Sequence, residues 1–177
     1  MTSQPGIRWI IAAVVAAVIG VAVVGASERR PLPPLALTSL DGQAVQVSEI
    51  SHEGNWLLLY VEPACGSCTA ILSAMSAEEH PGMAERVTVI VGGATVEQAA
   101  ALATASELGA AKWVLNPDRS ARAALNIKQA PMTIGVRGTM IEWTLSGVLR
   151  RSNEMTSVLV SWLKQSPPPV PGGPTAD

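Results

Sequence analysis

Apolar and polar positions alternate in two different rhythms along the chain, and each rhythm predicts a kind of element. The stretch LALTSLDGQAVQV alternates residue by residue on both sides of Asp41-Gly42, a dipeptide typical of tight hairpin turns. We therefore predict two antiparallel strands, Leu35–Leu40 and Gln43–Val47. The next run, Trp56–Val61, is continuously apolar, as expected of a central strand that is covered on both faces.

The remaining segments alternate between strand-like and helix-like patterns. In chain order we predict a helix over Ser67–Glu79, a strand over Arg86–Val91, a helix over Val96–Leu108 and a strand over Lys112–Leu115. These are followed by a short helix over Ser120–Leu125, a hairpin of the strands Met132–Val136 and Met140–Leu145, and a final helix over Asn153–Lys164. Strands that alternate with helices imply parallel neighbours and helices on both faces of a sheet. The predicted fold is therefore α/β, a central mixed sheet flanked by helices, with a β-hairpin extension at its N-terminal end.

The two ends of the chain differ in composition from this core. The run Trp9–Ala26 has no charged residue, and as a helix it would span about 27 Å, close to the hydrocarbon thickness of a bilayer. We expect residues 1–27 to form a cytoplasmic stub and a transmembrane anchor; a cleaved signal peptide is the alternative. The proline-rich residues 28–34 are predicted to be a stiff linker, and the Pro/Gly-rich residues 166–177 a disordered tail.

Composition favours one packed domain over residues 35–165 and excludes nucleic-acid binding. Hydrophobic residues make up 48% of the chain and charged residues 15%, which is enough apolar material for a core. The net charge is −2, and no basic run is longer than the pairs Arg29-Arg30 and Arg150-Arg151. Because binding to nucleic acid needs a positive face that displaces counterions, we exclude that class of function.

The only two cysteines, Cys65 and Cys68, lie between the predicted central strand and the helix that follows it. A strand that leads straight into a helix places Cys65 at the helix N-terminus, where unpaired N–H groups and the helix dipole favour a thiolate. Cys68 is one turn further along, so the two Cα atoms should lie about 5 Å apart, within the range that a disulfide tolerates. We predict that Cys65 attacks a substrate disulfide and that Cys68 resolves the mixed disulfide.

Three other interpretations of the cysteine pair stay open. A structural disulfide is one, although closing so small a loop would constrain the unfolded chain little. A zinc site is another; it needs about four ligands, and the chain offers only His52 and His80 as further soft donors. Two buried free thiols are the third. We favour the redox interpretation because the CxxC motif lies between a buried strand and a helix, and we expect neither a metal nor a cofactor.

These motifs together resemble the thioredoxin superfamily, specifically its membrane-anchored, extracytoplasmic TlpA/ResA type. The resemblance covers about residues 33–164 and rests on PPLALTSLDGQAVQVSEI, WLLLYVEPACGSC and LNIKQAPMTIGVRGTMIEWTLSGV. In this family a cis-proline faces the CxxC motif, and Pro131 matches it, with Gly138 and Gly147 at later family positions. The resemblance implies that the backbone of Ala130 pairs with the bound substrate. A narrower similarity, to the membrane-anchored MauD type, rests on SGVLRRSNEMTSVLVSWL.

The chain departs from the family pattern close to the cysteines. Many thioredoxins bury an acid six residues before the first cysteine, and Leu59 occupies that position here. Glu62, three residues before the first cysteine, is a candidate replacement for proton transfer; a solvated carboxylate at a strand end is the alternative. Between the cysteines, Gly66 would allow close approach of a partner's backbone, and the Ser67 hydroxyl could hydrogen-bond a thiolate.

From these features we expect an anchored thiol–disulfide oxidoreductase. It would meet disulfide-bearing or dithiol protein substrates, and a membrane or periplasmic electron-exchange partner, on the periplasmic side of the cytoplasmic membrane, because disulfides persist there. Residues 9–26 would contact the lipid bilayer. The resemblance implies cytochrome c maturation or assembly of a periplasmic enzyme as the setting. The alternatives are a copper-handling assembly protein of thioredoxin fold and a redox-inactive scaffold. The sequence does not fix the direction of electron flow.

Overall fold

An eight-stranded mixed sheet runs through the part of the chain that the computed structural model describes, namely residues 29–75, 82–106, 108–148 and 152–165. The strands are β1 (Arg30–Pro31), β2 (Leu37–Ser39), β3 (Ala44–Val45), β4 (Asn55–Val61), β5 (Val87–Gly92), β6 (Lys112–Asn116), β7 (Met132–Arg137) and β8 (Met140–Ser146). The helices are α1 (Val47–Ile50), α2 (Gly66–Ala74), the 3-10 turn η1 (Ala84–Arg86), α3 (Val96–Ala105), α4 (Ser120–Ala124) and α5 (Ser152–Lys164).

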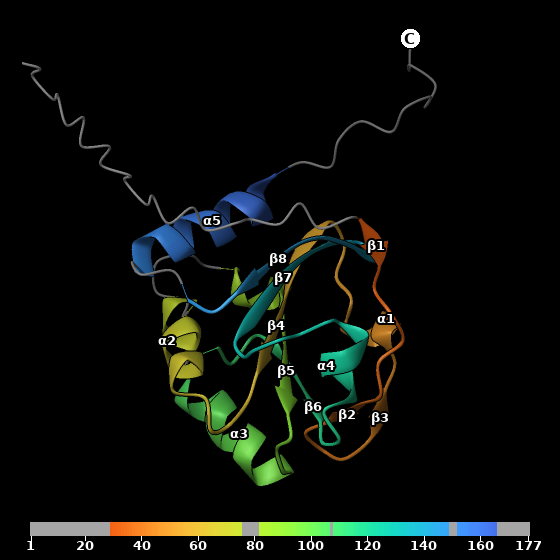
Figure 1. Cartoon of the computed structure of the whole chain (residues 1–177). Coiled ribbons are helices and arrows are strands. Elements are labelled where there is room, and N and C mark those ends of the chain that lie inside the picture. The colour runs from red at the N-terminus through yellow and green to blue at the C-terminus, as the bar shows by residue number, and fades with distance from the viewer. Residues whose placement is uncertain (1–28, 76–81, 107, 149–151, 166–177) are drawn as a thin grey trace, which may run out of the picture.

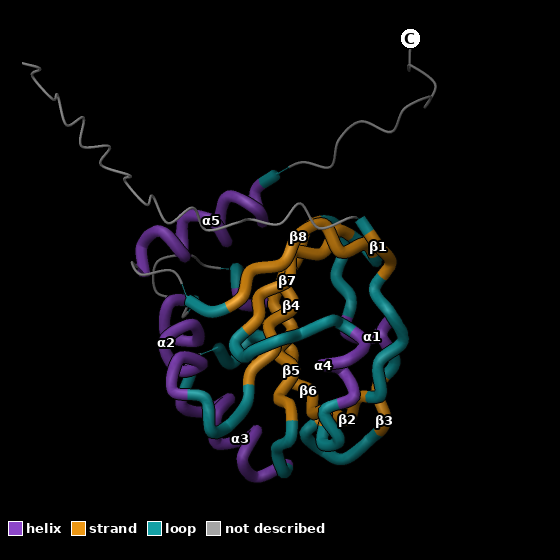
Figure 2. Tube along the Cα trace, viewed as in Figure 1, coloured by secondary structure: helices purple, strands orange, loops and turns teal. Residues whose placement is uncertain are grey.

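Strand β4 lies near the middle of the sheet, whose order is β1-β8-β7-β4-β5-β6-β2-β3. It pairs in parallel with β5, which pairs in parallel with β6, and it pairs antiparallel with β7 on its other side. Helices α2, α3 and α5 cover one face of the sheet, and α1 and α4 cover the other (Figures 1 and 2). The predicted mixed sheet with flanking helices is therefore confirmed.

The continuous apolar run of β4 is explained by burial on both faces. Leu57, Leu59 and Val61 contribute to the core beneath α2, α3 and α5, whereas Trp56 and Tyr60 contribute to the core beneath α1 and α4. Every residue of this strand is buried. Fully burying one such large apolar side chain stabilises a fold by roughly 1.5–3 kcal/mol, so β4 contributes to both cores at once.

The N-terminal hairpin is shorter than predicted, because its second strand gives way to a helix. Strand β3 covers only Ala44–Val45, and Val47, predicted to end that strand, begins α1. Gln46 caps this helix through a reciprocal capping box with Glu49, and Ile50 at its end is fully buried. The prediction of a strand through Val47 was wrong, because local capping and the burial of Ile50 outweigh the alternating pattern.

Other boundaries differ by a few residues. The third helix, α3, ends at Ala105 rather than at Leu108, which is buried beyond the helix end. Within the segment predicted to be a linker, Arg30 and Pro31 form β1 and pair with β8. The Arg30 guanidinium also donates to the carbonyl of Leu125 at 2.9 Å, which ties this entry segment to the body of the fold.

Several predicted features lie outside the described residues. These are the transmembrane or signal segment within residues 1–27, the disordered tail 166–177, and the last part of the helix predicted over Ser67–Glu79, since residues 76–81 are not described. Within the described ranges, no helix combines the length and the apolar character that crossing a membrane requires.

Candidate functional site

The two cysteines lie where β4 leads into α2, and their sulfur atoms form a disulfide. Cys65 is the N-cap residue of α2, and its N–H donates to the carbonyl of Glu62 at 3.1 Å. The N–H of Cys68 donates to the carbonyl of Cys65 at 3.0 Å, which closes the first turn. The Cα atoms are 5.3 Å apart, as one helical turn requires.

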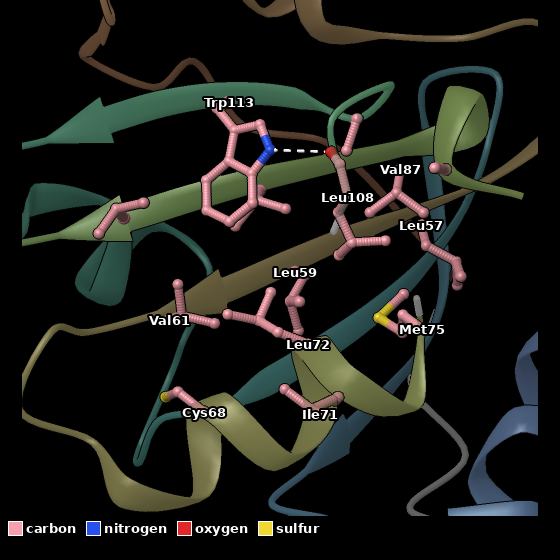
Figure 3. Close-up of a cluster of buried hydrophobic side chains, with 14 of the residues drawn as sticks. Leu57, Leu59, Val61, Cys68, Ile71, Leu72, Met75, Val87, Leu108 and Trp113 are labelled. Atoms are coloured by element: carbon pink, nitrogen blue, oxygen red, sulfur yellow. Dashed lines mark hydrogen bonds between the residues drawn. The ribbon is translucent and has the colours of Figure 1, made fainter. Parts of the chain in front are cut away.

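The two cysteines differ in their exposure. Cys68 is only 1% exposed and belongs to the core cluster beneath α2. Figure 3 shows it on the side of α2 that faces Leu59 and Val61 of β4. Cys65 is only partly buried, and its Sγ lies 3.5 Å from the exposed Oγ of Ser67. A partner approaching from solvent therefore meets Cys65 before Cys68.

The loop between the cysteines leaves space for such a partner. Gly66 is exposed, and a Cβ atom added to it would meet no heavy atom within 4 Å. Ser67 is exposed as well, so both residues between the cysteines face solvent. The absence of a side chain at Gly66 lets another backbone come close to the sulfur of Cys65.

Pro131 lies at the same end of the sheet as the cysteines, and the peptide bond between Ala130 and Pro131 is cis. Met132 pairs with Tyr60 across β7 and β4, so the register puts Pro131 at the carboxyl end of β4. The carbonyl of Pro131 accepts a hydrogen bond from Gly147 at 2.8 Å, while Ala130 contacts the cores on both faces of the sheet. Topology thus brings this dipeptide beside the loop that carries Cys65.

The position of the usual buried acid lies in an apolar cluster. Leu59 is fully buried in the cluster that contains Cys68. Its neighbour across the sheet is Thr133 of β7, which is also fully buried. Among the described residues, the Thr133 hydroxyl has no hydrogen-bond partner. Across the sheet, Leu59 therefore faces a buried hydroxyl rather than a carboxylate.

Glu62 lies on the other face of the sheet, in a network of polar groups. Its Oε1 accepts hydrogen bonds from the Tyr60 hydroxyl at 3.1 Å and from Nη1 of Arg122 at 3.2 Å. Nε of Arg119 lies 3.7 Å from the same oxygen. The Glu62 side chain is 19% exposed, so it is a partly buried, ion-paired carboxylate. Burial, and secondly the charge of Glu62, raise the pKa of Tyr60 well above its ordinary value.

The absence of a side chain at Gly92 makes room for this network. A Cβ atom at Gly92 of β5 would overlap the hydroxyl of Tyr60, so a larger residue would displace the ring. Glycine at this position allows the Tyr60 hydroxyl to reach Glu62 across the end of the sheet.

Comparison with known proteins identifies the architecture. No protein-family model and no curated protein matches the chain. Among solved structures, a secreted Mycobacterium tuberculosis disulfide oxidoreductase homologous to E. coli DsbE matches with a TM-score of 0.55 at 15% identity, over 73% of this chain and 96% of that one. A thioredoxin-like protein from Porphyromonas gingivalis matches with a TM-score of 0.58 at 18% identity, over 75% and 92%. The chain has a thioredoxin-like fold.

A third structure agrees with this fold. The DsbF protein of M. tuberculosis, solved in mixed oxidised and reduced forms, matches with a TM-score of 0.55 at 17% identity, over 75% of this chain and 96% of that one. In the thioredoxin-like fold of the present chain, the disulfide lies at a helix N-terminus beside a cis-proline. Such an arrangement can exchange a disulfide with a thiol that reaches the outer cysteine.

The zinc interpretation named two histidines in addition to the cysteines. His52 contacts Thr88, with Nε2 and Oγ1 3.1 Å apart, and its ring packs against Trp56. Burial, followed by the charges of Lys112 and Arg86, lowers the pKa of His52. His80 lies outside the described residues. Within the described ranges, no three His, Cys, Asp or Glu side chains come together as potential metal ligands.

Sequence reasoning did not single out Arg119 and Arg122, which hold Glu62. The two arginines are close in sequence, with Arg119 as the N-cap residue of α4 and Arg122 within that helix. Their partner is 60 residues away from Arg122, however, and only the pairing of distant strands brings them together.

Proposed function

We propose that the chain is a thiol–disulfide oxidoreductase that exchanges disulfides with partner proteins through Cys65 and Cys68. One observation carries the proposal: the partly exposed Cys65 caps a helix N-terminus and is bonded to the fully buried Cys68. The helix dipole and unpaired N–H groups at that position stabilise a thiolate on the sulfur that a partner can reach. Cys65 is therefore the nucleophile and Cys68 the resolving residue.

The exchange balances in two steps, written here in the reducing direction. The Cys65 thiolate attacks one sulfur of a substrate disulfide, and the other substrate sulfur leaves as a thiolate that takes up a proton. Cys68 then loses its proton and attacks Sγ of Cys65, which expels the second substrate thiolate and forms the Cys65–Cys68 disulfide. Two electrons pass from the dithiol to the substrate. The oxidising direction follows the same steps in reverse.

We assign the substrate's backbone to Ala130 and Pro131. Among the described residues, Ala130 forms no backbone hydrogen bond outside the regular elements, and it lies at the strand end next to the cysteines. An extended substrate segment could add its own hydrogen bonds there, as peptides do at unpaired strand ends. The exposed Gly66 would let the same segment come close to Cys65.

We further propose that the chain is membrane-anchored through residues 9–26 and that its domain faces the periplasm, as in the TlpA/ResA or MauD types. The uncharged run is long enough for a bilayer, and an exchanging disulfide requires an oxidising compartment. The similar M. tuberculosis oxidoreductase is a secreted protein, which agrees with this location. Cytochrome c maturation or assembly of a periplasmic enzyme is the setting we propose.

Trapping of a mixed disulfide tests the chemistry. The full-length Cys68→Ala variant should stay covalently linked to protein partners and to insulin, whose disulfides Cys65 attacks, because the variant has no second thiol to release them. The matched Cys65→Ala variant should capture none. If Cys68→Ala captures no partner and the wild-type chain reduces no disulfide, the oxidoreductase proposal fails. Stoichiometric Cu(I) binding at both cysteines together with negligible reductase activity would favour the copper-handling alternative instead.

Topology requires a separate test. Alkaline phosphatase fused after Lys164 should be active, because it folds with its disulfides only outside the cytoplasm, while a fluorescent reporter that folds only in the cytoplasm should be dark. The opposite pattern would refute the periplasmic placement without affecting the exchange chemistry.

A further inference from the structure

A single arginine side chain connects the two loops that form the proposed site. Arg122 lies on α4, and its Nη1 donates to Oε1 of Glu62 at 3.2 Å, while its Nη2 donates to the carbonyl of Lys128 at 2.9 Å. Glu62 begins the turn into the CxxC motif, since its own carbonyl accepts the N–H of Cys65. Lys128 precedes the cis peptide bond of Pro131 by a few residues. One guanidinium thus spans the CxxC loop and the cis-proline loop.

We propose that Arg122 is a positioning residue that sets the spacing between Cys65 and the Ala130–Pro131 backbone, and so determines the use of polypeptide substrates. The inference rests on the proposed oxidoreductase function and deepens it. A polypeptide substrate must contact both loops, with its sulfur at Cys65 and its backbone at Ala130. A small disulfide needs only Cys65.

The backbone of Arg122 is itself held in place. Its carbonyl accepts the N–H of Ile127 at 2.8 Å, and the preceding Ala121 donates to Oδ1 of Asn116 at 2.9 Å. Both Ala121 and Ile127 are buried against the sheet. The guanidinium therefore extends from a fixed base, and its planar fork can reach two acceptors at once, which a lysine ammonium cannot do in the same geometry.

Arg119 provides a matched comparison on the same carboxylate. It approaches Glu62 only to 3.7 Å, and its side chain is 53% exposed against 35% for Arg122. Among the described residues, no hydrogen bond links the Arg119 side chain to the loop before Pro131. Both arginines place a positive charge near Glu62, but only Arg122 also binds the carbonyl of Lys128. Comparing variants of the two residues therefore distinguishes an effect of charge from an effect of loop positioning.

Kinetics on two substrates test the proposal. With dithiothreitol present to re-reduce the full-length chain, and with its uncatalysed rate subtracted, Arg122→Gln should lower kcat/KM for insulin about tenfold or more, mainly through KM, because misplacement of one loop by about 1 Å is costly. Its kcat/KM for a small aromatic disulfide should stay within about twofold of wild type. Arg122→Lys should remain impaired on insulin, whereas Arg119→Gln should resemble wild type on both substrates.

Hydrogen exchange gives a readout that does not depend on activity. In Arg122→Gln or Arg122→Lys, the hydrogen-bonded backbone amides of Asn126, Ile127 and Cys65 should exchange faster than in wild type, while those of β4 and β5 should not change. If the Arg122→Gln variant does not fold, the same measurements are made on Arg122→Lys.

Three outcomes overturn the positioning role. They are an unchanged insulin rate in the Arg122 variants, an equal loss on both substrates, and an Arg119→Gln defect as large as that of Arg122→Gln. A wild-type chain that reduces neither substrate would instead refute the proposed function itself, and with it this inference.

Discussion

The two faces of the sheet differ in chemistry at the place where β4 ends beside the cysteines. On the face beneath α2, Leu59 lies in an apolar cluster with Cys68. The hydroxyl of Thr133 is buried on this face, and no described residue forms a hydrogen bond with it. On the face beneath α4, Tyr60 and Glu62 belong to a network of hydrogen bonds and ion pairs. Successive residues of one strand therefore enter opposite environments, since side chains alternate with a period of two.

This difference shows where the fold can hold a negative charge near the site. A buried carboxylate is tolerated only when several donors surround it, because the loss of hydration otherwise outweighs the attraction. Glu62 has a hydroxyl donor and two guanidinium groups. Leu59 lies in an apolar cluster with the Thr133 hydroxyl as its neighbour across the sheet, whereas the carboxylate of Glu62 lies on the face where cationic partners are available.

The largest effect is expected from placing a carboxylate on the apolar face. Leu59→Asp would bury an unpaired charge in a fully buried position, and should lower the free energy of unfolding at pH 7 by about 3–5 kcal/mol. Burial would raise the pKa of the new carboxyl above its unfolded value, so the folded state would lose stability as pH rises through the range between the two values. Urea unfolding measured from pH 4 to pH 8 gives both quantities.

The neutral variant separates charge from volume. Leu59→Asn has a similar shape to the aspartate variant and should also be destabilised, but its deficit should not change over the same pH range. If Leu59→Asp lost no more stability than Leu59→Asn at pH 8, the apolar face would contain a partner for the charge, and the contrast between the faces would be wrong.

A smaller effect is expected on the polar face, where Tyr60 is the only tyrosine of the chain. Tyr60→Phe removes a hydroxyl that donates to a carboxylate, and should cost about 1–2 kcal/mol of unfolding free energy at pH 7. Because the pKa of Tyr60 is raised in the folded state, its contribution is complete below pH 10 and is lost as pH rises further, when the unfolded chain releases the proton first.

Tyrosinate absorbance measures this titration directly, because one tyrosine gives the whole signal. We expect the absorbance to rise only well above pH 10, and the stability of wild type to fall more steeply there than that of Tyr60→Phe. A tyrosinate signal near pH 10, in protein that is still folded, would contradict the raised pKa of Tyr60.

Local patterns predicted the parts of the site that depend on neighbouring residues. The apolar run of β4, the helix that follows it and the two cysteines between them are all read within about twenty residues of sequence. The CxxC spacing sets the 5.3 Å between the Cα atoms through the pitch of a helix alone. These features need no knowledge of the rest of the chain.

Distant pairings could not be predicted in the same way. The role of Arg122 depends on Glu62, 60 residues earlier, and that of Arg30 on Leu125, 95 residues later. The pattern predicted Val47 as strand, although the capping box of Gln46 and Glu49 was present in the sequence. Periodicity indicates which face a residue occupies, but not which charged group from another element will meet it.

The smallest effect is expected from the unpartnered hydroxyl on the apolar face. Thr133→Val replaces a buried hydroxyl with a methyl group of similar size, and should raise the free energy of unfolding by about 1 kcal/mol, because no hydrogen bond is lost and the cost of burying the hydroxyl is removed. Thr88→Val is the matched control, since Thr88 is equally buried but donates to the carbonyl of Ile50 at 2.8 Å. That variant should lose about 1–2 kcal/mol in the same urea unfolding measurement. If Thr133→Val were instead destabilised as much as Thr88→Val, the Thr133 hydroxyl would have a partner, and the face that holds Cys68 would be less apolar than the contrast with Glu62 requires.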